Sequence, residues 1–116
     1  MFFIFADKEQ ISRVFINLLT NAIQSIPEER QGKVSVLLDL TPKTVIIKVI
    51  DNGKGIPDEL LEKLFVPNFT TKTSGMGLGL AITKNIVENS GGTIRFETKY
   101  GVGTTFIVEF PQEGKM

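Results

Sequence analysis

The sequence predicts a two-layer α/β sandwich, in which helices cover one face of a single β-sheet. The chain has 116 residues, a length that suits one domain around one core. Segments of strand and helix periodicity follow each other in the order strand, helix, two strands, short helix, loop, helix, two strands. Because most strands come in pairs separated by short links, they can pair as hairpins in a mixed or antiparallel sheet.

The first half of the chain supplies the first long helix and one hairpin. Phe2–Phe5 is apolar and predicts a short strand. Asp7 begins a candidate capping box, and apolar residues then recur at helical spacing until Pro27 ends the helix. Lys33–Leu40 and Thr44–Asp51 are rich in Val, Ile and Leu, and the short link between them indicates a hairpin.

The second half supplies two more helices and a second hairpin. Pro57–Leu64 predicts a short helix, and Val66–Ser74 is polar and lacks periodicity, which indicates a loop. Leu78–Asn89 has helical spacing and is closed by two consecutive glycines. Thr93–Thr98 and Thr104–Phe110 flank a turn that contains glycine, so they predict the second pair of strands.

The composition excludes several functions. The 13 basic and 13 acidic residues give zero net charge, so no basic field favours a nucleic acid as partner. The chain has no cysteine and no histidine, which excludes disulfides, thiolate metal sites and a histidine general base within it. Its apolar start is too short for a signal peptide or a membrane span, which indicates an intracellular domain.

The motif DNGKGIP places a carboxylate, Asp51, at the end of an apolar strand. Because side chains alternate along a strand, Asp51 shares its face with Val45, Ile47 and Val49. A carboxylate in that position needs hydrogen-bond donors, and the glycines that follow leave an opening beside it. It suits a flat ligand with an exocyclic amine, such as adenine. The alternative is that the motif is only a turn that follows a strand.

A second motif, GMGLGLAI, brings Gly75, Gly77 and Gly79 to the start of a helix. Unpaired N–H groups and the helix dipole make such a start an anion site, and glycine lets the backbone approach a phosphate closely. The spacing matches neither the P-loop nor the dinucleotide-binding fingerprint. The triplet therefore indicates either a phosphate-binding loop of another kind or a flexible turn.

A polar stripe runs along the first predicted helix. Asn17, Asn21 and Gln24 lie on one face, at positions i, i+4 and i+7. At about 100° per residue, Asn21 falls only about 20° from Val14, at the edge of the apolar arc. An amide oxygen there can serve as a ligand for Mg²⁺ beside phosphates. The alternative is an ordinary solvated face.

Four motifs in one order make a more specific pattern than any one of them. NLLTNAIQS (17–25), DNGKGIP (51–57), LFVPNFTTK (64–72) and GMGLGLAI (75–82) resemble, in order and spacing, the N, first glycine, F and second glycine boxes of histidine kinases. The chain is therefore identified as a member of the catalytic, ATP-binding domains of two-component sensor histidine kinases. These belong to the GHKL class, with gyrase, the ninety-kilodalton heat-shock chaperones and the MutL repair ATPases.

The resemblance implies a fold and a domain organisation. The fold is the Bergerat ATP-binding fold, an α/β (two-layer α+β) sandwich with a mixed sheet of about five strands and about three helices on one face. Residues 1–116 would form a single ATP-binding catalytic domain, as a fragment of a longer kinase.

The resemblance also implies which residues bind the base of the nucleotide. Asp51 would accept a hydrogen bond from the adenine amine. Gly53, Gly55 and Ile56 would border the base, and Thr104 would support Asp51.

On the phosphate side, Asn21 would coordinate Mg²⁺ and Asn17 would lie one turn earlier, near the phosphates. Lys72 would supply charge to the β- or γ-phosphate, so that these three residues form the implied catalytic group. Val66–Met76 would be the ATP lid, and Phe65 and Phe69 would anchor it or meet the histidine-bearing helices rather than touch ATP. The backbone would contact the phosphates at Gly75, Met76, Gly77, Leu78 and Gly79.

The chemistry implied is phosphoryl transfer rather than hydrolysis. The related ATPases carry a water-activating glutamate where this chain has Asn17, and an amide cannot act as a general base near neutral pH. The implied cofactors are ATP, with ADP as product, and Mg²⁺. The implied partners are a histidine-bearing dimerisation domain of the parent kinase and the receiver domain of a response regulator. The isolated domain would be monomeric and cytoplasmic, even where the parent kinase is anchored in a membrane.

Two other functions stay open on the sequence alone. A serine kinase of the anti-sigma type would share the fold and transfer the phosphoryl group to a serine of a partner. A nucleotide-sensing module would bind ATP without catalysis. Replacing Asp51 by Asn is expected to abolish ATP binding in all three cases.

Overall fold

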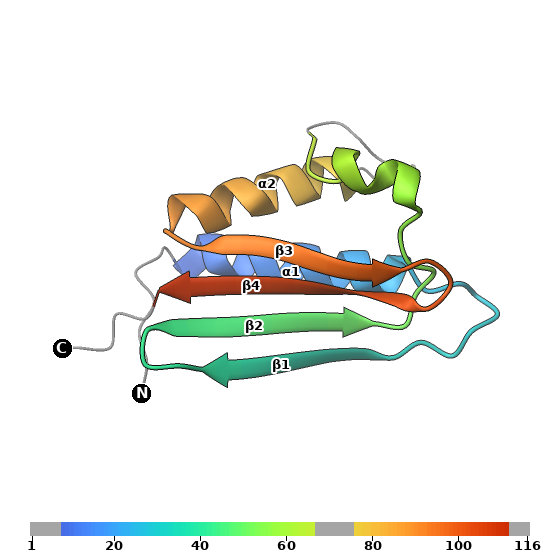
Figure 1. Ribbon diagram of the computed structural model, residues 1–116, viewed down its shortest axis with the longest axis horizontal. Helices are drawn as coiled ribbons and strands as arrows, with labels where there is room; N and C mark the ends of the chain where they lie inside the picture. Colours follow the sequence, from blue (N-terminus) through green and yellow to red (C-terminus); the bar gives the residue numbers. More distant parts are fainter. Residues whose placement is uncertain (1–7, 67–75, 112–116) are drawn as a thin grey trace.

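The computed structural model describes residues 8–66 and 76–111, which form two layers (Figure 1). One layer is a four-stranded sheet, and both long helices cover the same face of it (Figure 1). The elements are, in chain order, α1 (Lys8–Gln24), β1 (Val34–Leu40), β2 (Thr44–Asp51), the 3₁₀-helix η1 (Asp58–Lys63), α2 (Met76–Asn89), β3 (Thr93–Lys99) and β4 (Gly103–Pro111). The predicted two-layer α/β sandwich is confirmed.

The sheet has the strand order β1-β2-β4-β3, and each neighbouring pair is antiparallel. Short turns join β1 to β2 and β3 to β4, and a short turn can only connect antiparallel neighbours. The described part of the chain therefore has four strands without the mixed pairing that we expected. The predicted strand Phe2–Phe5, the fifth of the expected sheet, and the predicted cap Asp7 lie outside the described residues.

The core lies between the sheet and the two helices. Along β2, buried and half-buried residues alternate strictly, as its sequence predicted. The buried apolar side chains on the helix-facing side of the sheet are Val45, Ile47, Val49, Phe106, Val108 and Phe110. From α1 they meet Val14, Leu18 and Ala22, and from α2 they meet Leu80, Ile86 and Val87. One apolar layer therefore joins all of these elements and fixes the end of β2 beside α1.

Each of the three helices differs in one respect from the expectation. α1 ends at Gln24, because the backbone of Ser25 and its hydroxyl bond back to the last turn of the helix. The short helix η1 is a 3₁₀-helix, which suits a six-residue segment with no buried residue. α2 begins at Met76 rather than Leu78, so two glycines of GMGLGLAI lie within its first turn.

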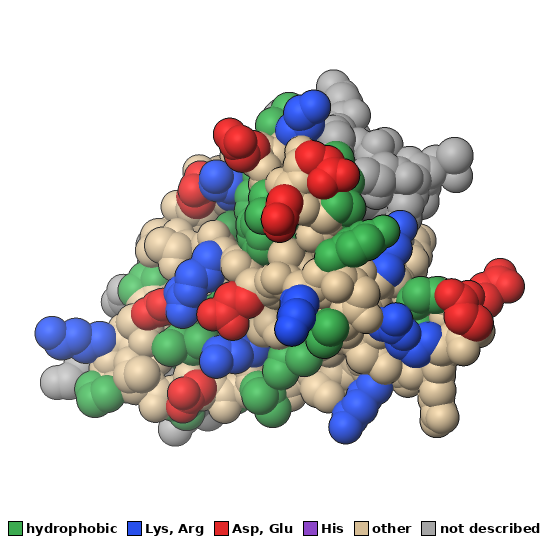
Figure 2. All heavy atoms as spheres, turned by 45° about the vertical axis from the view of Figure 1, so that its right-hand side comes forward, with side chains coloured by type: hydrophobic (Ala, Val, Ile, Leu, Met, Phe, Trp, Pro, Cys, Tyr) green, Lys and Arg blue, Asp and Glu red, His purple; other side chains and the backbone are tan. Residues whose placement is uncertain are grey.

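The surface carries mixed charge. Figure 2 shows basic and acidic side chains intermingled on one face, as expected for zero net charge. Apolar side chains are also exposed on the edge strand β1, where Val36, Leu38 and Leu40 lie on the helix-facing side and are about half exposed. No helix among the described residues is long and apolar enough to span a membrane.

Candidate functional site

Asp51 is a buried carboxylate at the end of β2. It is 5% exposed and lies on the same face as the core residues of that strand. Its Oδ1 atom accepts hydrogen bonds from the backbone N–H of Gly53, at 2.8 Å, and of Thr104, at 3.3 Å. These donors offset the cost of burying the carboxylate and hold it at one orientation. The structure therefore has a hydrogen-bond acceptor at the end of an apolar strand, as the sequence pattern predicted.

The glycines of DNGKGIP allow the backbone to fold closely around Asp51. Gly55 has a φ of +76°, and a Cβ atom there would collide with the carbonyl oxygen of Lys99. A Cβ atom on Gly53 would collide with the side chain of Ser25 and lie 2.9 Å from Oδ1 of Asp51. Both positions exclude larger residues, because other chain segments occupy the space of a side chain.

Arg30 clamps the loop that follows Asp51, a role that the sequence analysis missed. Its Nη1 atom donates to the carbonyl oxygens of Asn52, at 2.7 Å, and Gly53, at 2.8 Å. Its Nη2 atom donates to the carbonyl oxygen of Gly101 in the β3–β4 turn, at 3.2 Å. Lys54 adds a link of its own, since its carbonyl oxygen accepts from the N–H of Gly101 at 2.6 Å. The loop is thus held between the segment before β1 and the β3–β4 turn.

A second missed residue, Thr98, lies beside Thr104. The two threonines are register partners on β3 and β4, and Thr104 is also the register partner of Asp51 on β2. Asp51, Thr104 and Thr98 therefore form one polar row across three strands, on the face that the helices cover. The hydroxyl oxygens of the threonines are 2.8 Å apart, and Thr98 also accepts the N–H of Ile56 at 3.0 Å. The predicted residues Ile56 and Thr104 are thereby joined through Thr98.

The polar stripe of α1 is not an ordinary solvated face. Asn17 and Asn21 are half-buried, whereas Gln24 is exposed. The Nδ2 atom of Asn17 donates to Oγ1 of Thr83, a fully buried residue of α2, at 3.2 Å. The following turn of α1 carries Asn21, and the end of the helix contacts the DNGKGIP loop through Ser25. Asn21 therefore lies between the contact with α2 and the loop of Asp51.

A metal ion at Asn21 would find few protein ligands. No group of three or more His, Cys, Asp or Glu residues in the described ranges could hold a metal ion. Mg²⁺ prefers oxygen ligands and keeps several waters, and it is often bound by one or two protein groups together with the phosphates of a nucleotide. The amide oxygen of Asn21 suits that kind of site rather than a site built by the protein alone.

The structure describes only some of the residues that we predicted to bind the phosphates. Met76, Gly77, Leu78 and Gly79 form the first turn of α2, where backbone N–H groups lack partners within the helix. Such a turn can bind an anion through its backbone. Lys72 and Gly75 lie outside the described residues, as does most of the expected lid.

Phe65, the expected lid anchor, is packed into an aromatic cluster. Its ring centroid lies 5.9 Å from that of Phe96 and 6.5 Å from that of Phe106. The Nζ atom of Lys84 on α2 lies 5.3 Å from the Phe65 ring centroid. The segment that enters the expected lid therefore starts from a fixed point on β3, β4 and α2.

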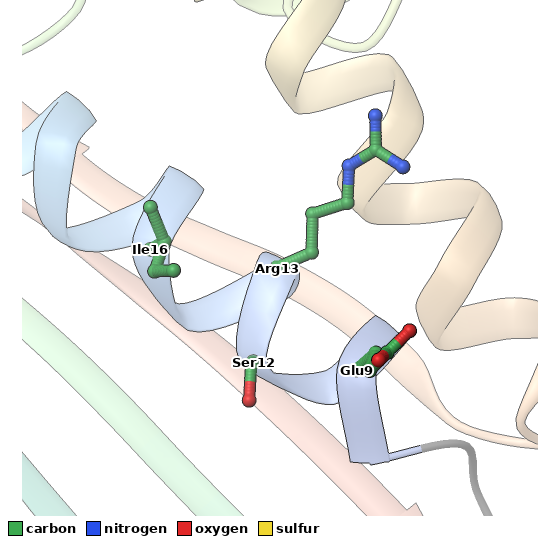
Figure 3. Close-up of a pocket in the computed structure, with 4 residues that line it drawn as sticks. All are labelled: Glu9, Ser12, Arg13 and Ile16. Carbon is green, nitrogen blue, oxygen red and sulfur yellow. The ribbon is translucent and has the colours of Figure 1, made fainter.

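A hollow on the surface of α1 lies apart from these residues. It is lined by Glu9, Ser12, Arg13 and Ile16 (Figure 3). They belong to the first turns of α1, at the end opposite Ser25 and the DNGKGIP loop. The hollow therefore contains none of the predicted site residues.

Comparisons with known proteins agree with this geometry. The model of the family "Histidine kinase-, DNA gyrase B-, and HSP90-like ATPase" matches residues 6–114. The chain is 44% identical over 106 residues to the sensor histidine kinase ZraS of Escherichia coli K12, covering 91% of this chain and 22% of that protein. It is 39% identical over 111 residues to sporulation kinase A of Bacillus subtilis 168, covering 96% of this chain and 18% of that protein.

Two solved structures have the same fold. One is the catalytic domain of the histidine kinase ThkA in a nucleotide-free form, with a TM-score of 0.78 and 43% identity, covering 91% of this chain and 68% of that one. The other is the mycobacterial sensor histidine kinase MprB, with a TM-score of 0.83 and 28% identity, covering 98% and 80%. The chain spans only about a fifth of the length of the curated relatives, at 22% and 18%.

Proposed function

Because the chain belongs to the family of histidine kinase-, DNA gyrase B- and HSP90-like ATPases, we propose that it binds Mg-ATP and donates the γ-phosphoryl group to a histidine on a separate domain. The acceptor must lie outside this chain, which contains no histidine. The proposal assigns the chain to two-component signalling, as the catalytic part of a sensor kinase.

The observation that carries the proposal is the buried Asp51. Its carboxylate is an acceptor fixed by two backbone donors at the end of an apolar strand. An exocyclic amine of a flat base supplies the complementary donor, and the apolar neighbours Val49 and Ile56 suit the faces of the base. Gly53 and Gly55 allow Ser25 and the backbone at Lys99 to pack closely against the loop that follows Asp51. Adenine meets each of these requirements.

The phosphates of the same nucleotide would lie toward α2. The first turn of α2 offers backbone N–H groups from Met76 to Gly79, and Asn21 on α1 offers an amide oxygen to Mg²⁺. Lys72 would add a positive charge at the β- or γ-phosphate. When bound, Mg²⁺ neutralises charge that develops on the transferred group. The protein's own part is to position the nucleotide and to exclude water.

Asn17 supports transfer rather than hydrolysis. Its amide is not a base near neutral pH, and its Nδ2 group donates to the buried Thr83 hydroxyl. That contact gives the residue a packing role between the two helices. A water-activating carboxylate at this position would place two acceptors opposite each other unless the threonine hydroxyl turned to donate. We therefore infer that the nucleophile is activated on the partner domain.

The proposed transfer of the phosphoryl group to a separate domain implies two partners. The first is the histidine-bearing dimerisation domain of the parent kinase, and the second is the receiver domain of a response regulator, which takes the phosphoryl group from that histidine. We expect the isolated chain to be a monomer, and the use of ATP implies a cytoplasmic location.

Incubation with Mg²⁺ and γ-labelled ATP tests the proposal. The chain is mixed with the histidine-bearing domain of its parent kinase, and label is followed on both proteins. The proposal predicts acid-labile label on the partner, none on this chain, and no label on a partner whose histidine is replaced by glutamine. Base-labile label on a serine would instead identify a serine kinase. ATP binding without any label on either protein would identify a nucleotide-sensing module.

A further inference from the structure

We propose that Thr98 is a positioning residue that fixes the hydroxyl of Thr104 as a hydrogen-bond acceptor beside Asp51. The inference rests on the proposed nucleotide site and deepens it. It explains how the site would prefer a 6-amino purine to a 6-oxo purine. Thr98 lies on β3, in no motif that the sequence analysis identified, and shares a row with Thr104 and Asp51 across the sheet.

The hydroxyl of Thr98 has a limited capacity for hydrogen bonds. A threonine hydroxyl has one hydrogen and two lone pairs. Oγ1 of Thr98 has three polar neighbours: the N–H of Ile56 at 3.0 Å, the carbonyl oxygen of Gly103 at 3.2 Å, and Oγ1 of Thr104 at 2.8 Å. The Ile56 N–H can only donate and the Gly103 carbonyl can only accept. All three contacts can therefore be hydrogen bonds at the same time in only one assignment of the hydroxyl hydrogens.

In that arrangement the hydrogen of Thr98 goes to Gly103, and one lone pair accepts from Ile56. The remaining lone pair of Thr98 accepts the hydrogen of the Thr104 hydroxyl. Thr104 then has no hydrogen left to donate, and its oxygen presents lone pairs only. Its backbone N–H is already given to Oδ1 of Asp51. The two side chains at the end of the apolar layer, Asp51 and Thr104, therefore act as acceptors together.

Two neighbouring acceptors match an amine and reject a carbonyl. The 6-amino group of adenine carries two hydrogens, whereas a 6-oxo group carries only lone pairs. A carbonyl placed there would face acceptors without a hydrogen between them, and buried polar groups that lose their partners are costly. If Thr98 were removed, Thr104 would be free to turn its hydrogen toward the base and to donate to a 6-oxo group. Thr98 thus acts on the preference for the base through Thr104.

The test compares ADP with inosine diphosphate, whose base carries a 6-oxo group and an N1 hydrogen in place of the 6-amino group and the N1 lone pair of adenine. Calorimetric dissociation constants are measured for the unmodified chain, Thr98→Val and Thr98→Ser. Thr98→Val is expected to reduce the preference for ADP by about five- to tenfold, the value of one hydrogen bond. Thr98→Ser keeps the hydroxyl and is expected to keep the preference. Thr93→Val, the same change at an exposed position of β3, is the matched control and is expected to change nothing.

A double-mutant cycle shows whether the effect passes through Thr104. If it does, adding Thr98→Val to a Thr104→Val chain leaves the preference for ADP unchanged. If Thr98→Val does not fold, Thr98→Cys, with a thiol that bonds weakly, carries the same expectation. Equal preference in the unmodified chain and Thr98→Val would overturn the role of Thr98 and leave the nucleotide site standing. Failure of the unmodified chain to bind ADP would overturn both.

Discussion

Replacing Asp51 by Asn changes one atom group at the centre of the proposed site. The Oδ1 atom of the residue accepts from two backbone N–H groups, at 2.8 and 3.3 Å. An asparagine oxygen can accept from both, so the loop after β2 keeps its anchor. The other oxygen becomes an NH₂ group, which is a donor. The amine of adenine, itself a donor, would then face a donor instead of a carboxylate.

The expected effects on binding and on stability differ. Loss of one hydrogen bond to a charged group weakens binding by about 1.5–3 kcal/mol, or about 10- to 150-fold. The opposed donors and the burial of Asp51, at 5% exposed, place the effect at or beyond the upper end of that range. The free energy of unfolding is expected to change by no more than about 1 kcal/mol, because the internal acceptor is retained.

Calorimetry with ADP and urea denaturation measure the two effects separately. Asp39→Asn is the matched control, since it makes the same change at an exposed position of β1 and is expected to alter neither quantity. The reasoning is refuted if Asp51→Asn folds and binds ADP within about threefold of the unmodified chain. It is also refuted if Asp51→Asn loses binding only because it unfolds.

Further substitutions test the packing around the site and in the core. Gly55→Ala is expected to lower the free energy of unfolding by about 2 kcal/mol or more, because its backbone is left-handed and its Cβ would meet the Lys99 carbonyl. Gly101→Ala, with positive φ but open space, should cost only about 1 kcal/mol, and equal losses in denaturation would contradict this reading. Arg30→Met removes three hydrogen bonds to the loops around Asp51. Calorimetry should therefore show an affinity for ADP about tenfold weaker, and Arg30→Lys should have an intermediate affinity. Unchanged affinity would show that these hydrogen bonds do not support the site. Phe106→Ala, at a residue 1% exposed, should cost about 3–5 kcal/mol in urea denaturation, and a loss near zero would mean that the core lies elsewhere.

The periodicity of the sequence predicted the strands, the helices and the side of the sheet on which each strand residue lies. The alternation along Thr44–Asp51 placed Asp51 on the core face, and the structure confirms that burial. The short links of both hairpins predicted antiparallel pairs, which the register confirms. The start of α2 was predicted two residues late, because glycine lowers helix propensity even in a first turn, where its cost is small.

Contacts between distant segments could not be read from the sequence. Arg30 reaches a carbonyl 71 residues further along the chain, and it lies in an irregular segment without a motif. Asn17 was assigned to the phosphates from the family resemblance, whereas its bond to Thr83 depends on how α1 packs against α2. Thr98 is an intermediate case: the register of the second hairpin places it opposite Thr104, so a known register would have found it.

Calorimetric titration of the purified chain with ADP and with ATP tests whether the site around Asp51 binds a nucleotide for transfer rather than hydrolysis. Each titration is made with and without Mg²⁺, and phosphate release is followed in the same samples. We expect saturable binding that depends on Mg²⁺, with negligible phosphate release. Binding with steady release would contradict the role given to Asn17 and make the chain an ATPase. No binding of either nucleotide would contradict the site built around Asp51.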